Sequence, residues 1–486
     1  MIQNKTYLLL IIVFVVTWNS IAQNRDIVQD SLNDSQKITE EYGQLFIKKR
    51  FNLIRFRDDF SYLKNTEKTK LWEKLKYIPV GNFYLSIGGD ARTELEFLRT
   101  DGLNLETSTD DYFWDQRLMA HVSLRGKRFR SFVQLNKSWR LNNELPQSPN
   151  DEDELALHQA FFDIKFDDRP EAQASYLRLG RQEFFVGSGR FFGIREGPNM
   201  RLSYDGISGR ANINNFRGDF FYLREVAIRE HIFDNEIFGD NTIYGAYGTY
   251  KYGNDKNGQS AELYYVGLER PLAFYQDLVG EDNRHTLGTR YVFRHRGQQG
   301  FDIDAEFNYQ FGEFNNLDVS AYSFSLNADY FWKTVNEIEH RLGFKANLYS
   351  GDKDATDNKI GTFNPINPAL GFLGRLVVFR WSNLAALHPS YRISFGDSFA
   401  INAENAFLWR PQKEDFLYAP STLPYSAENR NGEESYVGML PSIEAEWAVN
   451  AFLSFEIYYA ALLKGNYFID EENDIHNIAI TTYFRF

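Results

Sequence analysis

The chain has 486 residues, with 53 basic and 66 acidic side chains and a formal net charge of -13. This balance argues against a nucleic-acid partner, because no basic excess is available to neutralise phosphates. The chain has no cysteine, so its fold cannot depend on disulfides. Its mean hydropathy of -0.46 is polar despite 43 Phe and 29 Tyr, as expected for a sheet with one apolar and one polar face.

The N-terminus has the pattern of a secretory signal peptide, residues 1–22. Lys5 precedes an apolar run over residues 7–16, and the small residues Ser20 and Ala22 mark a cleavage site. The run is about half of the roughly 20 residues that a spanning helix needs, which disfavours a membrane anchor. Residues 23–80 follow as a polar extension, periplasmic or lumenal, with a helical turn or two expected around residues 66–76.

From residue 83 onward the hydrophobic pattern has a period of two, which predicts strands with one apolar and one polar face. The clearest run alternates polar residues with Phe301, Ile303, Ala305, Phe307, Tyr309 and Phe311. The runs have about ten to fourteen residues, whereas a typical globular strand has roughly 5–6. Membrane-spanning strands need about 9–11, so their length favours a transmembrane barrel.

We expect eighteen strands, joined alternately by short links and by longer polar stretches such as 185–200, 229–240, 269–284 and 351–383. Short periplasmic turns and longer outer loops are typical of outer-membrane barrels. Sixteen strands remain possible, since 201–213 and 218–228 alternate poorly. The expected strands are 83–98, 112–125, 129–140, 155–167, 174–184, 201–213, 218–228, 241–252, 259–268, 285–296, 301–312, 319–333, 340–350, 384–395, 399–410, 436–449, 451–463 and 475–486.

The predicted fold class is all-β: a transmembrane up-and-down antiparallel β-barrel over residues 81–486. The expected location is the outer membrane of a Gram-negative bacterium, with its lipid bilayer as a partner. The chain ends in an alternating strand whose last residue is Phe486. A terminal aromatic of this kind predicts recognition by the barrel-insertion machinery.

Catalytic and metal-binding motifs are scarce, and neither a cofactor nor a metal site is predicted. His121 and His388 fall on polar strand faces and are interpreted as lumen residues. The alternative is a lumenal hydrolase acting on lipid or glycan, but no serine and acid stand beside them in a recognisable pattern.

The polar strand faces carry many cations interleaved with acids such as Glu94, Asp304 and Glu404. Guanidinium groups bind carboxylates through paired hydrogen bonds, so such a lumen suits an anionic polymer or a sugar acid. The alternative is a network of structural salt bridges across the wall. The predicted pore-lining cations from these strands are Arg92, Arg117, Arg178, Arg290, Arg294, Arg341, Lys345 and Arg392.

Several stretches, in the right order over residues 55–410, resemble the alginate export family of outer-membrane proteins. They include Ile87-Gly88-Gly89-Asp90-Ala91-Arg92, Leu179-Gly180-Arg181-Gln182-Glu183, Tyr204-Asp205-Gly206 and Gly361-Thr362-Phe363-Asn364-Pro365. The resemblance implies an eighteen-stranded barrel with an arginine-lined constriction that conducts a polyuronate outward. By position it adds Arg181, Arg190 and Arg201 to the pore-lining residues, with Asp205 as an internal partner. The charged extension at 23–80 and the acidic lumen depart from the alginate exporter itself.

The sequence therefore predicts a non-enzymatic porin that passively conducts an anionic polysaccharide, oligosaccharide or small anionic solute. A barrel hydrolase and a secreted soluble glycan-binding β protein are the alternatives. The long outer stretch 351–383 is expected to fold over the mouth.

Overall fold

The computed structural model describes residues 51–486, apart from 101–108, 144–147, 170–172, 255, 276–277, 369–373, 421–424, 426–431 and 470–473. The expected signal peptide, and residues 23–50 of the polar extension, lie outside the described residues.

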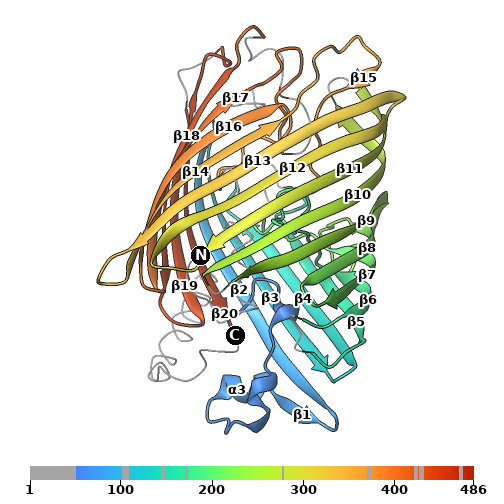
Figure 1. The fold of residues 1–486 in the computed structure, drawn as a ribbon, viewed down its shortest axis with the longest axis vertical. Coiled ribbons are helices and arrows are strands. Elements are labelled where there is room, and N and C mark those ends of the chain that lie inside the picture. The colour runs from blue at the N-terminus through green and yellow to red at the C-terminus, as the bar shows by residue number, and fades with distance from the viewer. Residues whose placement is uncertain are drawn as a thin grey trace.

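Eighteen antiparallel strands form one closed barrel (Figure 1). The barrel strands are β2 Phe83–Thr100, β3 Thr109–Arg125, β4 Phe129–Leu141, β5 Asp153–Lys165, β6 Tyr176–Gln182, β7 Tyr204–Ile213, β8 Phe216–Val226, β9 Ile237–Asn254, β10 Asn257–Tyr275, β11 Leu278–His295, β12 Gln299–Phe314, β13 Leu317–Lys333, β14 Ile338–Tyr349, β16 Leu384–Phe395, β17 Phe399–Trp409, β18 Tyr436–Ala448, β19 Leu453–Lys464 and β20 Ile475–Arg485.

The first and last barrel strands close the sheet. β2 pairs with β20 from Asp90 opposite Arg485 to Arg99 opposite His476, and with β3 along its other edge. Beyond the last ladder pair, Gly89 and Phe486 exchange two main-chain hydrogen bonds of 3.1 and 3.0 Å. In hydrocarbon each unpaired main-chain group costs several kcal/mol, so this closure is what allows such a sheet to enter a membrane.

The predicted eighteen strands are confirmed, and the alternative of sixteen is wrong, because β7 and β8 both pair over their full length. The weak alternation of the β7 sequence has a steric cause, a close main-chain approach at two facing glycines. Gly180 and Gly206 face each other across β6 and β7 with φ of +128° and +158°. A Cβ at these positions would lie 2.3 Å from the Ala160 carbonyl oxygen and 2.2 Å from that of Tyr222, respectively. Glycine is required there, and it leaves no side chain to mark the strand face.

One predicted outer loop is largely strand, and a second is strand only at its end. β10 continues to Tyr275 and β11 begins at Leu278, within the stretch 269–284 that was expected to be a loop, and β9 begins at Ile237 within 229–240. These extensions are rich in polar residues, so they carry no alternation by which the sequence could show them.

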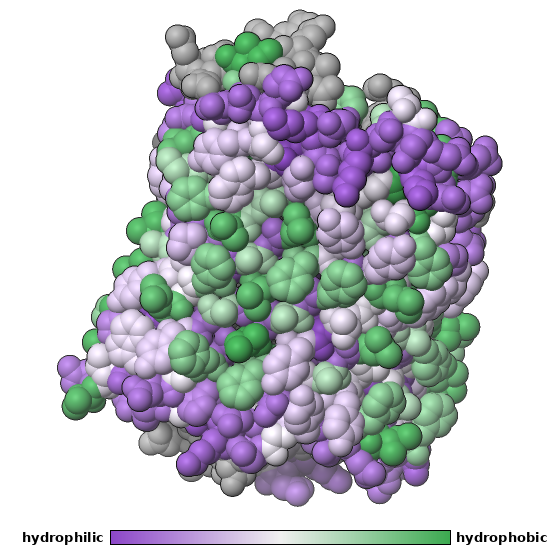
Figure 2. All heavy atoms as spheres, turned by 45° about the horizontal axis from the view of Figure 1, so that its top comes forward, coloured by the Kyte–Doolittle hydropathy of each residue, from purple (hydrophilic) through white to green (hydrophobic). Residues whose placement is uncertain are grey.

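The outer wall carries exposed apolar side chains, including Leu118, Val122, Phe307, Ile478 and Ile480. On the face that Figure 2 draws, a belt of hydrophobic side chains lies between two polar edges. Among the described residues, no helix is long and apolar enough to cross a membrane.

The hydrophobic core lies inside the barrel, where chain segments fold in from both ends. The N-terminal segment contains η2 Arg55–Arg57, η3 Ser61–Asn65, α3 Leu71–Lys76 and β1 Ile78–Val80, and β1 pairs with β2. Its Phe56 joins one buried cluster with Phe192 of the β6–β7 loop and Trp381 of the β14–β16 segment. That last segment also holds β15 Lys359–Ile360, which pairs in parallel with β13. The expected folding of 351–383 over the mouth thus takes the form of insertion into the barrel.

Candidate functional site in the barrel lumen

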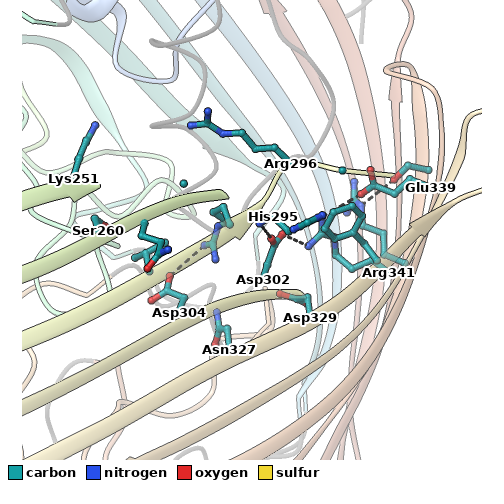
Figure 3. A pocket seen from close by; sticks show the side chains of 18 of the residues that line it. Lys251, Ser260, His295, Arg296, Asp302, Asp304, Asn327, Asp329, Glu339 and Arg341 are labelled. Carbon is teal, nitrogen blue, oxygen red and sulfur yellow. Dashed lines mark hydrogen bonds and ion pairs between the residues drawn. The ribbon is translucent and has the colours of Figure 1, made fainter. Parts of the chain in front are cut away.

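A cavity of about 1480 Å³ lies in the lumen at the end of the barrel where the turns are short (Figure 3). We call it the vestibule. Its lining residues come mainly from β8–β14 and β16–β18, and it reaches the turns at Gly297 and Gly396. Four of the predicted pore cations line it: Arg294, Arg341, Lys345 and Arg392.

Each of these four cations is paired with a carboxylate, and the cation is the more exposed partner in the principal pair. The Arg294 side chain is 33% exposed and Asp304 is 6%, with 3.5 Å between them. Lys345 is 26% exposed and Glu404 is 7%, at 2.6 Å. The same order holds for Arg341 with Asp302 at 2.7 Å and for Arg392 with Glu446 at 3.6 Å. Glu339, which is more exposed than its partner Arg341, is the exception. In these pairs the carboxylate lies closer to the wall than its cation, and Arg294 and Lys345 are the more exposed of the four cations. Glu337 and Asp397, in the short turns, are exposed carboxylates of the lining.

At the inner end of the vestibule, Asp304 gathers two further arginines. Arg290 donates two hydrogen bonds to it, of 2.9 and 2.6 Å, and also contacts Glu262. Arg190, carried by the β6–β7 loop, reaches Asp304 at 3.1 Å and Glu306 at 3.5 Å. Both arginines are buried, and Arg190 holds the inward loop against β12.

The β6–β7 loop, residues 183–203, is tied to the opposite wall by a second arginine cluster. Arg201 contacts Glu183 at 3.1 Å and also pairs with Glu196. Arg117 of β3 reaches Glu196 at 2.6 Å, and Arg92 of β2 donates to the main-chain oxygens of residues 196 and 197. Burial disfavours the Glu196 carboxylate, but Arg117 and Arg201 outweigh it and hold its pKa below the usual range.

The β14–β16 segment crosses to the acidic wall of β2 and β19. Arg375 contacts Glu94 at 2.5 Å and also pairs with Glu456, while its main-chain amide donates to the Tyr458 hydroxyl at 3.0 Å. The wall thus supplies carboxylates and the inserted segment supplies the guanidinium that neutralises them.

The N-terminal segment clamps the junction of the first and last strands. Arg55 donates to the Gly89 carbonyl at 2.9 Å and to the Phe486 carbonyl at 2.8 Å. It also pairs with Asp58 at 2.9 Å and Asp90 at 2.8 Å. Burial acts against the charge on Arg55, but the two carboxylates prevail and raise its pKa. The guanidinium remains charged and bridges both sides of the barrel seam.

Three arginines of β3, β4 and β6 bind the next part of this segment. Arg125 and Arg130 donate to the Phe56 carbonyl at 2.9 and 3.0 Å, and the Arg178 guanidinium stacks 4.0 Å from the Phe56 ring. Arg130 and Arg178 share the fully buried Asp163, at 2.6 and 2.8 Å. The segment also touches the β6–β7 loop, since Arg201 donates to the Leu53 carbonyl at 3.3 Å. On this side the lumen is occupied by the protein's own chain.

Lys76 at the end of α3 is buried beside the seam. Its Nζ donates to the Ile87 carbonyl at 2.8 Å and lies 5.3–5.4 Å from the ring centres of Phe51, Phe60 and Phe486. Burial, with a further contribution from Arg55, lowers the pKa of Lys76 to about 7.

The two predicted lumen histidines are enclosed by wall contacts. His388 is fully buried and lies 3.2 Å from Glu404, which also binds Lys345. His121 is buried and stacks on Phe132 with ring centres 5.3 Å apart.

A family model described as alginate export matches residues 83–480, which include all but the last residues of the barrel just described. The chain belongs to the alginate export family. No curated protein matches it.

Solved outer-membrane barrels of Pseudomonas aeruginosa share the fold of this alginate export family member at low identity. OccK2 (OpdF), solved in complex with glucuronate, is 11% identical with a TM-score of 0.57; the match covers 82% of this chain and 97% of that one. OpdK, solved with vanillate, is 9% identical with a TM-score of 0.54, covering 82% and 98%.

Family and fold together make the protein an outer-membrane channel of a Gram-negative bacterium. In such barrels the short turns face the periplasm and the longer loops face outward. The vestibule and the N-terminal segment therefore lie at the periplasmic end.

Two of the residues predicted to line the pore point outward instead. Arg178 faces the lumen, so Arg181, three residues along β6, faces the other side of the wall. It pairs with Asp205 of β7 at 2.8 Å beside Leu135, Leu157 and a cavity on the outer surface. The expectation that Arg181 and Asp205 line the pore is corrected by strand geometry, because successive side chains alternate between faces.

The sequence did not identify Arg55 and Arg375 as lumen residues, although both bind an inserted segment to the barrel wall. One signal for Arg375 was available: it precedes the apolar run Leu376-Val377-Val378-Phe379, which is unusual for an exposed loop. For Arg55 only the nearby Asp58 was a local signal, because its other partners are Asp90 and the main-chain oxygens of residues 89 and 486.

Proposed function

We propose that this channel passively conducts small anionic solutes or anionic saccharides along the cations of its periplasmic vestibule. The observation that supports this most is the difference in exposure within the ion pairs. Within these pairs, a solute in the cavity meets the Arg294 guanidinium and the Lys345 ammonium before their carboxylates, which are the less exposed partners. Buried carboxylates also fix the cations in place, which lowers the entropic cost of binding an anion.

The comparisons support the same chemistry at a coarser level. The family is described by the export of alginate, a polyanionic saccharide. OccK2 and OpdK were solved with glucuronate and vanillate, which are both carboxylates. Carboxylates are the anions that arginine binds through two parallel hydrogen bonds.

The inward segments are proposed to restrict passage. Arg190 on the β6–β7 loop and Arg375 on the β14–β16 segment reach carboxylates on β12 and on β2 with β19, respectively. Solutes can cross the lumen only past these two segments. Displacement of the segments would therefore widen the path and increase conductance.

Planar-bilayer recording of the full chain tests the proposal. With a salt gradient across the bilayer, the reversal potential should show anion preference, and Arg294→Gln combined with Lys345→Gln should reduce it. Arg128→Gln removes one cation from an exposed turn outside the vestibule and should leave the preference unchanged. Cation preference in the unmodified protein would overturn the proposal.

The hydrolase alternative has less support. His388 is enclosed and its Nδ1 faces Glu404, and His121 is stacked on Phe132. We assign both to packing of the lumen wall. Hydrolysis of a lipid or polyuronate by the purified protein, lost in His388→Gln, would reverse that assignment.

A further inference from the structure

The charges that line the vestibule are unevenly distributed around it. Among its described lining residues, those from 169 to 298 include five cations and no carboxylate. Every lining carboxylate comes from residues 302–446. We call the first group the cation wall: Arg169, Arg217, Lys251, Arg294 and Arg296. Figure 3 shows Lys251 and Arg296 on one side of the cavity, and Asp302, Asp329 and Glu339 on another.

Across the cavity, β16–β18 line the lumen with Arg392, which is buried and paired with Glu446, and with further polar side chains. Ser390, Ser394, Asn402 and Glu444 line it and are all half-buried. We call these four residues the hydroxyl-binding wall, because serine and asparagine donate and accept hydrogen bonds and the glutamate carboxylate accepts them, as sugar hydroxyls require. The strands β12, β13 and β14 separate the two walls along the sheet.

Ion pairs occur on the cation wall, where Arg169 pairs with Asp167 and Arg217 with Asp219, and also in the sector between the walls. Asp302 is held by Arg341, and Glu404 by Lys345. The charges of each wall act on a solute mainly at short range, because dissolved ions screen charges beyond about 8 Å at physiological salt. A solute that spans the vestibule would meet cations at one end and hydrogen-bond acceptors at the other.

We propose that the vestibule is a binding site for a polyhydroxylated monocarboxylate, oriented across the lumen. Its carboxylate faces the cation wall and its hydroxyl groups face the hydroxyl-binding wall. A carboxylate placed at the far wall would meet the half-buried Glu444, while Arg392 on that wall is buried and paired with Glu446, so a second charge at the other end of the solute is unfavourable there. This inference rests on the proposed anion conduction and narrows its substrate class to small sugar acids rather than a polyanionic chain.

Block of single-channel current tests the inference, with the full chain in planar bilayers and the probe added on either side. The probes are gluconate, a polyhydroxylated monocarboxylate; hexanoate, which lacks the hydroxyls; sorbitol, which lacks the charge; and a trigalacturonate. Gluconate should reach half-block at a concentration about tenfold below those of hexanoate and sorbitol. Trigalacturonate should not block at a lower concentration than gluconate.

Variants of each wall separate its two contributions. Lys251→Gln with Arg296→Gln removes two exposed cations and should raise the half-block concentration of gluconate about tenfold. Glu444→Gln should change block by gluconate more than block by hexanoate, since only gluconate reaches that wall. Arg128→Gln is the control for charge outside the cavity.

The outcomes also separate the inference from the proposed function. Equal block by gluconate and hexanoate, stronger block by trigalacturonate, or wall variants that behave as Arg128→Gln would each overturn the inference, while anion preference would leave the proposed function standing. Cation preference would remove both.

Discussion

Both sides of the lumen carry arginine–carboxylate pairs, but the pairs serve different purposes on the two sides. Along β2–β6, Arg125, Arg130 and Arg178 are enclosed, because the N-terminal segment and the β6–β7 loop pack onto this side of the lumen. Along β8–β18, similar pairs border the vestibule and keep their cations exposed. The charge pattern of the strands does not distinguish the two sides. What distinguishes them is which chain segment covers the wall.

This difference separates structural from accessible arginines. Arg178 is enclosed between Asp163 and the rings of Phe56 and Phe161, at 4.0 and 3.7 Å, so no solute can reach it. Arg294 faces the cavity. The comparison can be tested by disturbing each side in turn.

The largest expected effect is at the seam. Arg55→Ala leaves the buried Asp58 without its guanidinium and Asp90 with Arg485 alone, and the carbonyl oxygens of residues 89 and 486 lose their side-chain donor, which should lower the free energy of unfolding by about 3–5 kcal/mol. Urea denaturation of the barrel in lipid vesicles measures this. Arg99→Ala removes an arginine that is 63% exposed, and should cost less than about 1 kcal/mol. Similar losses for the two variants would contradict the assigned role of Arg55.

On the enclosed side, Asp163→Asn should cost about 3 kcal/mol, because Arg130 and Arg178 lose the carboxylate that they share. The same denaturation assay applies. Ion preference should not change, since the pair does not border the vestibule. A change in reversal potential without a loss of stability would show that solutes reach this side.

Docking of the N-terminal segment should depend on pH through Lys76. The folded state lowers its pKa from 10.5 to about 7, so the released segment binds more protons between these values. Docking should therefore strengthen as pH rises above 7, by at most about tenfold per pH unit, and level off below pH 7, where both states are protonated. The groups that face Lys76 are Arg55, Asp58, Asp90 and His121.

Fluorescence of Trp72, which packs against Phe452, can follow this docking from pH 6 to 9. Lys76→Met removes the titrating amine and should abolish the dependence. If the dependence persists in that variant, another group is responsible.

On the open side, Arg294→Gln should cost less than about 1 kcal/mol of stability, because the pair is partly exposed. Its effect should appear in permeation, as a reduced preference for anions in bilayer recordings. A large loss of stability would place Arg294 with the structural arginines.

The smallest effect on permeation is expected from Arg181→Gln. Its partner Asp205 also lies on the outer face, so the reversal potential should equal that of the unmodified protein. A shift comparable to that of Arg294→Gln would mean that this pair communicates with the lumen.

The strands were predictable because alternation and length follow directly from a wall with lipid on one side. Where that constraint ends, the prediction fails: β10 and β11 extend into a polar stretch that was expected to be a loop. Strand parity would also have placed Arg181 outside, because Arg178 was already assigned to the lumen.

The coverage of the lumen could not be predicted from periodicity. Phe56 and Trp381 enter one buried cluster from segments more than 300 residues apart in sequence, and no local pattern marks that meeting. The predicted arginines were therefore found as a set, but their division into enclosed and exposed groups depended on the tertiary structure.

The clamp of Arg55 on the carbonyl oxygens of residues 89 and 486 has a consequence for biogenesis. These two carbonyl oxygens come within reach of one guanidinium only after the first and the last barrel strands, β2 and β20, have paired. Residue 55 is synthesised long before residue 486, so the N-terminal segment cannot dock in this way until the barrel has closed. Its docking would then report that assembly has finished.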